Sequence, residues 1–205
     1  MSEITDLTVD RLALTRGGRL LQPQISFSVA AGDILLVKGP NGAGKTSLLR
    51  AIAGLLDVPN GRITFRMRPD GTVASPEDRL SRIGWFGHQH GVKRQLSLTE
   101  NLRFFARYNG TAAEVDWALA VVGLAGLSDL PAQTLSHGQR RRLAFARLLV
   151  VPRPLWLLDE PMTSLDDGAK LCVRDRIREH CGKGGIVVAA SHENLGCDGE
   201  TVELE

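Results

Sequence analysis

The sequence predicts an α/β fold with a mainly parallel sheet, an antiparallel β subdomain at the start and a helical insertion. Apolar and polar residues alternate at the start of the chain, as in a half-exposed antiparallel sheet. Further along, short apolar segments alternate with helix-period segments in residues 1–95 and 151–205, whereas about 96–150 shows helical spacing and no convincing strand. Strands that alternate with helices imply a parallel sheet covered on both faces. We therefore expect a single domain, 1–205, whose sheet-forming core is interrupted by a helical stretch.

Length and composition agree with one compact globular domain. The chain has 205 residues, 43% of them hydrophobic, and its 25 Lys+Arg against 23 Asp+Glu give a formal net charge of +2. A chain of this size buries about 70% of the surface of its unfolded form. The composition excludes disordered, collagen-like and disulfide-dense chains. The small net charge also argues against a dedicated nucleic-acid binder, so no nucleic-acid partner is expected.

Membrane-spanning segments and disulfides are not expected. The longest run without a formal charge, 20–32, has 13 residues, whereas a spanning helix needs about 20. The N-terminus lacks the basic and apolar regions of a signal peptide. Cys172, Cys181 and Cys197 are odd in number and form no Cys-x-x-Cys motif. This usage favours reduced thiols in a cytosolic protein.

The expected strands and helices follow from residue spacing and turn residues. Gly17-Gly18 provides the turn between the first two strands. Strands are expected around 4–9, 25–29, 33–37, 61–65, 83–86, 155–158, 185–190 and 201–204. Helices are expected over 45–55, 99–108, 112–122, 136–150 and 167–181. Ligands of such parallel sheets bind beyond the carboxyl ends of the strands.

A glycine-rich loop between the apolar segment 33–37 and the amphipathic helix 45–55 fits the pattern G-x-x-x-x-G-K-[ST]. Glycines let the backbone turn tightly, so that successive N–H groups and the positive end of the helix dipole face one anion. Lys45 adds a mobile cation for the β- and γ-phosphates, and the Thr46 hydroxyl suits Mg²⁺. The predicted nucleotide-binding residues of this P-loop are Gly39, Pro40, Asn41, Gly42, Ala43, Gly44, Lys45, Thr46 and Ser47.

An acidic pair lies at the end of another predicted strand. Four apolar residues, 155–158, precede Asp159 and Glu160. Asp159 is expected to orient Mg²⁺ and its waters, directly or through a water. Glu160 is expected to face the other reactant and to polarise the attacking water as general base, which contributes about 10²–10⁴-fold in rate. A phosphorylated ligand and Mg²⁺ are therefore expected at this site.

Three further segments complete a pattern that resembles ATP-binding-cassette (ABC) ATPases. Leu135-Ser136-His137-Gly138-Gln139 precedes a helix and is similar to their signature motif. Gln89 is placed like the glutamine of their Q-loop, His192 like their switch histidine and 163–166 like their D-loop. With the P-loop and the pair Asp159-Glu160, these segments occur in the family's order and cover nearly the whole chain.

The resemblance implies an ABC nucleotide-binding domain of the P-loop NTPase fold. In it, 1–95 and 151–205 would form a RecA-like core with a β subdomain, and about 96–150 the helical signature subdomain. The family also implies a second cassette as partner, arranged head to tail so that the signature of one subunit closes on the ATP held by the other. Two identical copies would form a homodimer with C₂ symmetry.

The resemblance also assigns roles to single residues. Ser136, Gly138 and Gln139 would contact the ATP of the partner subunit. Gln89 would bind Mg²⁺ and the attacking water, and His192 would bind the γ-phosphate and position Glu160 and the water. The implied catalytic residues are Glu160, His192 and Gln89, and the implied metal ligands are Thr46, Gln89 and Asp159.

Three positions near these motifs call for comment. His137 stands where a glycine is usual in the signature, so its side chain must point away from the phosphate or add a donor. Arg16 stands about where the family often has an aromatic that stacks on adenine, and a guanidinium also stacks. Arg140-Arg141-Arg142 is expected to form the solvated side of the signature helix rather than a lipid or nucleic-acid patch.

Finer features indicate a branch of the family. A single cassette with 13 residues after His192 favours a transporter subunit. The segments 85–93 and 96–102 resemble the ATP-binding subunits of bacterial cytochrome c maturation systems, and 123–131 and 184–188 agree. That resemblance implies a peripheral subunit at the cytoplasmic face of the inner membrane, docked on integral membrane permease subunits, whose ATP hydrolysis drives haem export or release of a haem-loaded chaperone.

Direct haem binding is not predicted, because no residue indicates it. Two alternatives stay open: the ATPase of another small exporter or importer, and an ATP-switched assembly module that hydrolyses poorly. A soluble kinase or GTPase would share the P-loop but would leave the signature motif and His192 unexplained.

Overall fold

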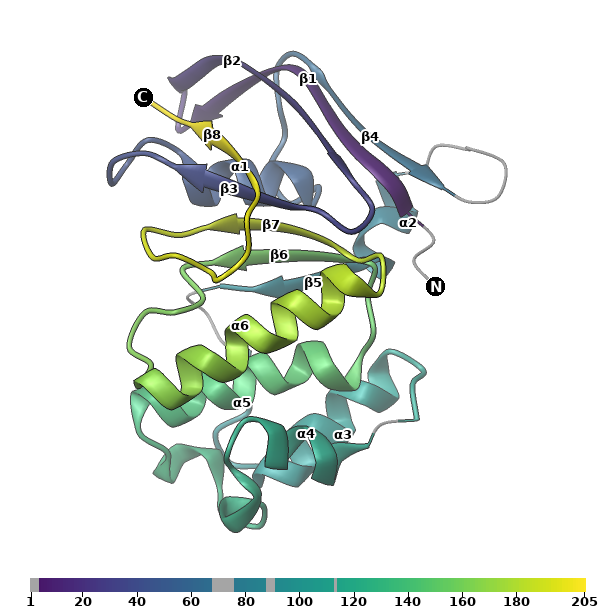
Figure 1. Cartoon of the computed structure of the whole chain (residues 1–205), viewed down its shortest axis with the longest axis vertical. Helices are drawn as coiled ribbons and strands as arrows, with labels where there is room; N and C mark the ends of the chain where they lie inside the picture. The colour runs from purple at the N-terminus through teal and green to yellow at the C-terminus, as the bar shows by residue number, and fades with distance from the viewer. Residues whose placement is uncertain (1–3, 68–75, 88–90, 113) are drawn as a thin grey trace.

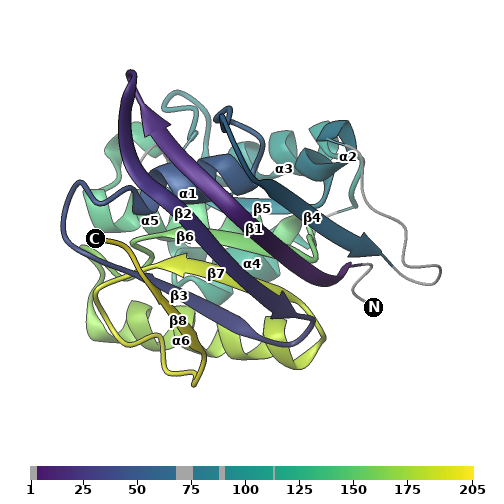
Figure 2. The same cartoon turned by 90° about the horizontal axis from the view of Figure 1, so that it is seen from above.

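The computed structural model describes residues 4–67, 76–87, 91–112 and 114–205, which form two sheets and a set of helices (Figure 1). A three-stranded sheet lies at one end, and helix α1 (Lys45–Ile52) packs between it and a five-stranded sheet (Figures 1 and 2). Helices α3 to α6 lie on the opposite face of the five-stranded sheet (Figure 1). The predicted α/β class, with a parallel and an antiparallel sheet, is confirmed.

The three-stranded sheet is antiparallel, with the order β2-β1-β4. Its first two strands join at Gly17 and Gly18, whose φ angles of 57° and 79° suit glycine. Both strands run further than residue alternation predicts, because register shifts along the pair reset the alternation. One shift includes Arg11, which has a φ of 46°. The strands are β1 (Ile4–Arg16), β2 (Arg19–Ala30) and β4 (Arg62–Met67).

The five-stranded sheet is parallel throughout, with the order β5-β6-β7-β3-β8. Every residue of β6 and β7 is buried. Along β6, Leu157 packs on the α1 side and Trp156 on the side of the other helices. Each fully buried leucine of this kind contributes roughly 1.5–3 kcal/mol. The strands are β3 (Ile34–Lys38), β5 (Ile83–Phe86), β6 (Leu155–Asp159), β7 (Ile186–Ala190) and β8 (Glu200–Glu203).

The helices agree with the predicted ones in place and differ at their ends. The first helix ends at Ile52, because Gly54 follows with a φ of 72°. The short helix α2 (Pro76–Ser81) is not predicted by the sequence pattern. The others are α3 (Leu98–Tyr108), α4 (Val115–Val121), α5 (His137–Val150) and α6 (Asp167–Gly182), with 3-10 turns η1 (Ala125–Leu127) and η2 (Ala132–Thr134).

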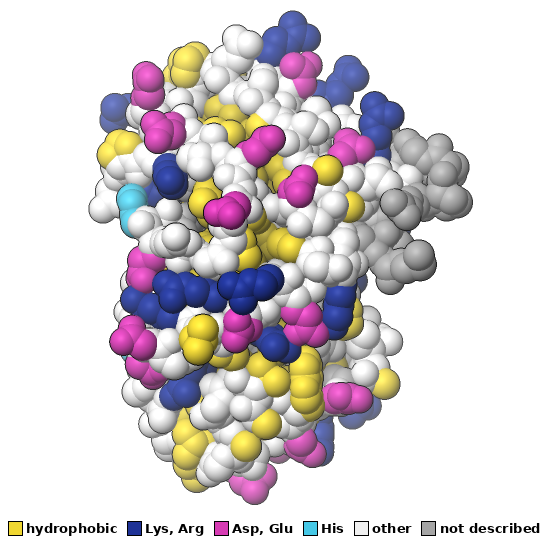
Figure 3. All heavy atoms as spheres, in the orientation of Figure 1, with side chains coloured by type: hydrophobic (Ala, Val, Ile, Leu, Met, Phe, Trp, Pro, Cys, Tyr) yellow, Lys and Arg dark blue, Asp and Glu magenta, His cyan; other side chains and the backbone are white. Residues whose placement is uncertain are grey.

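Charges on the surface over α6 are largely paired. Figure 3 shows a band of Lys and Arg side chains across this face with acidic side chains beside it. Lys183 Nζ lies 2.6 Å from Glu179 Oε1, and Arg178 Nη1 lies 3.0 Å from Asp175 Oδ1. Cys172, Cys181 and Cys197 are free thiols. Within the described residues, none of the helices has the length and apolar character needed to cross a membrane.

Candidate active site

The glycine-rich loop runs from the end of β3 to the first residue of α1. Gly39, Gly42 and Gly44 have φ angles of 139°, 91° and 105°, which L side chains rarely adopt. Space is also limiting at Gly39, where a Cβ would lie 2.4 Å from the carbonyl oxygen of Leu204. Gly44 is the N-cap of α1, so no side chain caps the first turn. The loop and the helix N-terminus can therefore present backbone N–H groups to an anion.

Lys45 is the first residue of α1 and its ammonium reaches back across the loop. Its Nζ donates to the carbonyl oxygens of Gly39 at 2.6 Å and Pro40 at 3.1 Å. The same nitrogen lies 3.2 Å from Nε2 of His192. Only 9% of Lys45 is exposed. The cation is thus held inside the concavity of the loop rather than in solvent.

Thr46 and Asp159 link the loop to the central strand β6. The Thr46 hydroxyl donates to Asp159 Oδ2 at 2.9 Å, and Asp159, the last residue of β6, is 3% exposed. A hydroxyl and a carboxylate at hydrogen-bond distance form an oxygen donor pair, and hard cations such as Mg²⁺ take oxygen ligands. The residues present therefore fit a magnesium ion.

Glu160 directly follows β6 and has an unusual backbone. Its φ of 50° lies in the left-handed region, where a residue other than glycine is strained. Its N–H donates to the carbonyl of Ala190 at 2.8 Å. One carboxylate oxygen, Oε2, accepts from the Thr163 hydroxyl at 3.4 Å, and Oε1 lies 3.6 Å from His192 Nε2. The carboxylate therefore turns toward the residue that follows the neighbouring strand.

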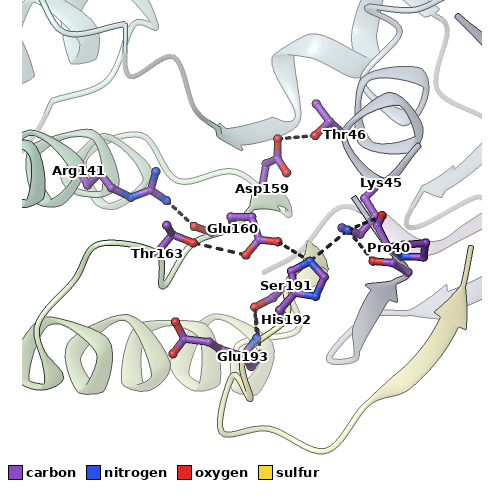
Figure 4. A network of polar contacts seen from close by, with 11 residues as sticks. Pro40, Lys45, Thr46, Arg141, Asp159, Glu160, Thr163, Ser191, His192 and Glu193 are labelled. Carbon is purple, nitrogen blue, oxygen red and sulfur yellow. Dashed lines mark hydrogen bonds and ion pairs between the residues drawn. The ribbon is translucent and has the colours of Figure 1, made fainter. Parts of the chain in front are cut away.

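His192 follows β7 and lies between Lys45 and Glu160. The turn that presents it is held by Ser191, whose hydroxyl donates to the Glu193 carbonyl and accepts from the Glu193 N–H, both at 3.1 Å. The side chain of His192 is 55% exposed and that of Glu160 is 18% exposed. Figure 4 shows the lysine, histidine and glutamate in series beside the Thr46–Asp159 hydrogen bond. These side chains meet because β6, β7 and β3 are successive neighbours in the sheet and all end at the same edge.

A cavity of about 180 Å³ opens beside these groups. Arg16 lines it, as do Asn41, Asp159 and Glu160. A larger hollow of about 610 Å³ lies elsewhere, around Trp117 and Arg176. The chemistry of the lining, and not the volume, distinguishes the smaller cavity: its lining joins the glycine loop to both carboxylates.

The predicted signature residues lie at the N-terminus of α5. Ser136 is the N-cap: its hydroxyl accepts from the Gln139 N–H at 3.2 Å, and Gln139 Oε1 accepts from the Ser136 N–H at 2.8 Å. A Cβ on Gly138 would lie 3.0 Å from the carbonyl oxygen of Ser164, so the D-loop passes close by. Ser136 and His137 are exposed. These residues do not line the cavity beside the P-loop.

The expectation that the three consecutive arginines are solvated is wrong. Arg141 is 2% exposed, and its Nη2 donates to the Glu160 carbonyl. Arg140 donates to the Leu135 carbonyl, and Arg142 donates to that of Val122 at 3.2 Å. Arg141 is buried because it precedes Phe145 and Leu148 by four and seven residues, on the face of α5 that packs inward. That spacing is the signal in the sequence that would have located it.

The predicted Q-loop residue Gln89 lies outside the described residues. The described segment after it is held by Asn101, which the sequence analysis missed. Asn101 Nδ2 donates to the carbonyls of Lys93, Leu96 and Ser97 at 3.0, 3.1 and 2.9 Å, and Oδ1 accepts from the Lys93 N–H at 2.8 Å. The signal in the sequence that could have located it is a single amide side chain on the apolar face of α3. Asn101 is only 7% exposed there.

Comparison with known proteins agrees with this geometry. The family model of the ABC transporter matches residues 23–163. The cytochrome c biogenesis ATP-binding export protein CcmA 2 of Cupriavidus metallidurans is 43% identical over 201 residues, which cover 97% of this chain and 94% of that protein. The CcmA protein of Agrobacterium fabrum is 41% identical over 198 residues, covering 94% and 92%.

Solved structures show the same fold. An ATP-binding subunit of an ABC transporter superposes with a TM-score of 0.84 at 24% identity, over 98% of this chain and 86% of that one. A putative ABC transporter ATP-binding protein of Pyrococcus furiosus gives a TM-score of 0.82 at 24% identity, over 98% of both chains. The resemblance read from the motifs is confirmed: the chain is an ATPase of the type coupled to transport. It belongs to the ABC transporter ATP-binding family and, within it, to the cytochrome c biogenesis ATP-binding export proteins CcmA.

Proposed function

We propose that this protein hydrolyses Mg-ATP at the carboxyl edge of its parallel sheet and thereby drives a membrane complex of cytochrome c biogenesis. The observation that carries the chemistry is the series Lys45, His192 and Glu160 beside the Thr46–Asp159 hydrogen bond. The observation that favours this branch is the identity of over 40% to export proteins named for cytochrome c biogenesis.

The P-loop binds the phosphates of ATP through backbone N–H groups from Gly39 to Ser47. Lys45 exchanges its hydrogen bonds to the loop carbonyls for oxygens of the β- and γ-phosphates, to which its charge is better matched. Arg16, at the wall of the cavity, stacks on the adenine ring.

Thr46 and Asp159 would hold Mg²⁺, with Gln89 as a further ligand, and Asp159 would act directly or through a water. The bound ion would neutralise charge on the phosphates and orient them. Because Asp159 is buried and already paired with Thr46, the oxygens of both are in place before the ion arrives.

Glu160 acts as general base toward the attacking water, and this contributes about 10²–10⁴-fold in rate. His192 lies between the base and Lys45, at the exposed rim. From there its ring binds the γ-phosphate and fixes Glu160 and the water. Gln89 completes the catalytic group.

The protein acts as a pair of cassettes, most simply a homodimer, with ATP at the interface. The exposed N-terminus of α5 supports this arrangement, because Ser136, Gly138 and Gln139 can contact a nucleotide on a second copy. Residues 1–95 and 151–205 form the core with its β subdomain, and about 96–150 form the helical signature subdomain. Integral permease subunits hold the pair at the cytoplasmic face of the inner membrane.

The variant Glu160→Gln tests the ATPase part of the proposal. Removing the base while keeping the shape should trap an ATP-bound dimer with little turnover. Phosphate release measures turnover, and light scattering after gel filtration measures the mass with and without ATP. A folded variant that stays monomeric with ATP would contradict the composite site.

The partner is tested separately. The tagged chain is captured from detergent-solubilised membranes, and the co-purifying proteins are identified and assayed for haem. Recovery of an importer or lipid-exporter permease in place of cytochrome c biogenesis proteins would reject the branch and leave the ATPase assignment intact.

A further inference from the structure

Arg141 is a buried charge that the proposed reaction does not use. It lies on α5, five residues after the N-cap Ser136, and is the largest of the fully buried side chains in the described part of the chain. Taking a guanidinium out of water is costly unless its donors and charge are matched. The Nε of Arg141 is buried without a hydrogen-bond partner in the described part of the chain, so the contacts that the rest of the guanidinium makes are informative.

Those contacts lie at the ends of two strands. The Arg141 Nη2 donates to the carbonyl oxygen of Glu160, directly after β6. The guanidinium carbon lies 5.0 Å from the ring centroid of Phe86, the last residue of β5, within range of a cation–π interaction. Figure 4 shows Arg141 reaching from α5 to the backbone of Glu160, on the side away from Lys45. One side chain thus connects the signature helix with the strand end that carries the catalytic carboxylate.

Two carboxylates lie near the Arg141 charge. Burial lowers the pKa of Arg141 below its ordinary value, and the nearby carboxylates of Asp159 and Glu160 offset part of this shift. The charge of Arg141 therefore lies on the α5 side of the acidic pair. Lys45 lies on the loop side, with His192 between it and Glu160.

Glu160 needs such support because its backbone is in the left-handed region, with a φ of 50°. Its N–H donates to the Ala190 carbonyl at 2.8 Å, and its carbonyl accepts from Arg141 and from the Thr163 N–H, the latter at 3.3 Å. With both backbone groups held, the direction in which the Glu160 side chain leaves the backbone is set. Loss of the Arg141 bond would leave the carbonyl with only the 3.3 Å bond from the Thr163 N–H and would loosen the peptide that follows Glu160.

We propose that Arg141 is a positioning residue for Glu160: it holds the strained backbone that aims the carboxylate, and it makes that aim depend on where the signature helix lies. This rests on the proposed function, in which Glu160 is the base and the N-terminus of the same helix contacts the partner subunit's ATP. Contact between Ser136 and the partner subunit's nucleotide would then affect, through α5 and Arg141, the position of Glu160, the general base in the subunit's own site.

The test compares Arg141→Met with Arg142→Met in the purified full chain. The two changes are chemically identical and adjacent, but Arg142 donates to the carbonyls of Val122 and Gly123, away from the acidic pair. The values of kcat and KM for ATP are measured by phosphate release, and ATP-dependent dimerisation by light scattering. A misplacement of the base on the order of 1 Å costs about 100-fold.

For Arg141→Met we expect kcat to fall roughly 30- to 100-fold with KM changed less than about 2-fold, because binding is intact and only the chemical step is impaired. The ATP-bound dimer should accumulate, as in Glu160→Gln. Arg142→Met should keep kcat within about 3-fold of the wild type. Arg141→Lys, which keeps the charge and one donor, should recover part of the loss and serves as the test variant if Arg141→Met does not fold.

Two outcomes would overturn the inference while the wild type is active. One is a folded Arg141→Met variant whose kcat matches that of Arg142→Met. The other is a raised KM with loss of the ATP-bound dimer, which would show that Arg141 serves nucleotide binding at the signature and not Glu160. A wild type that neither hydrolyses ATP nor dimerises with it would instead overturn the proposed function, and with it this inference.

Discussion

The carboxyl edge of the parallel sheet and the N-terminus of α5 both carry motif residues, but they are built differently. At the sheet edge, Lys45, His192 and Glu160 contact one another from three separate segments of the chain. At the helix N-terminus, Ser136 and Gln139 satisfy each other within one turn, and the surface stays exposed. The first region is a network internal to this chain, whereas the second offers an open surface.

The difference follows from the elements that carry each region. Strands β6 and β7 are buried along their whole length, so the residues that follow them are fixed by the packing of the sheet. An α-helix N-terminus leaves N–H groups that need a cap or a ligand. In α5 the capping box satisfies the N–H groups of Ser136 and Gln139. We therefore expect turnover to depend most on the residues at the sheet edge. ATP-dependent dimerisation should depend most on the residues at the N-terminus of α5.

The largest effect is expected from Lys45→Ala, which removes the cation from the sheet edge. Turnover should fall about 10²–10³-fold, the usual result of losing one preorganised donor to developing charge. The measurement is phosphate release at saturating ATP. It also separates an ATPase from an ATP-switched module, because only an ATPase has a steady wild-type rate to lose.

Lys38→Ala is the matched control for that variant. Lys38 ends β3 at the same edge but its side chain is exposed, so the change should leave turnover near that of the wild type. Equal losses in the two variants would mean that positive charge in general, and not the placed ammonium of Lys45, supports the reaction.

The sequence predicts the sheet edge well, because the order and direction of the strands determine which residues lie there. Once alternating strands and helices indicate a parallel sheet, the residues after each strand must share one edge. The structure pairs Thr46 with Asp159 and Lys45 with His192 there. The fold class is confirmed. The roles of these residues stay predictions, and Gln89 lies outside the described residues.

The helical region is predicted less completely, because side-chain contacts there depend on packing. Three consecutive arginines suggest solvent, yet the inward face of α5 buries Arg141. Asn101 likewise satisfies backbone groups of a loop whose course no residue spacing reveals. Helix α2 is six residues of mostly polar sequence, too short for helical periodicity to appear.

An intermediate effect is expected at the opposite end of β6 from the reactive edge. His180 stacks on Trp156 with ring centroids 4.0 Å apart. Burial lowers the pKa of His180 to about 4. Hydrogen bonds with the backbone of Ile186 and Pro154 act in the opposite direction and raise this pKa, whereas the charge of Lys183 lowers it further. The unfolded chain binds this proton more readily than the folded one. Stability is therefore complete above a pH of about 6.5 and falls as the pH drops toward 4.

Between pH 7.5 and pH 5, His180 should lower the free energy of unfolding by about 2 kcal/mol. Urea unfolding at the two pH values measures it, as the difference between the wild type and His180→Gln. Turnover at pH 7.5 should not require this histidine, unlike His192 at the reactive edge. An unchanged pH dependence in the variant would show that other groups cause the acid sensitivity.

The smallest effect on stability, and the sharpest contrast, comes from two serine caps in the helical region. Ser97 caps α3 with Glu100 as Ser136 caps α5 with Gln139, and both form capping boxes. Replacing either serine by alanine should cost about 1 kcal/mol of stability, measured by urea unfolding.

If the N-terminus of α5 serves only as a cap, turnover should respond equally to both changes. If it also contacts the partner subunit's ATP, Ser136→Ala should lower turnover about 10-fold, the equivalent of one hydrogen bond to a charged group, while Ser97→Ala stays near the wild type. Equal turnover in two equally destabilised variants would remove the functional distinction of this helix and leave the sheet edge as the whole of the site.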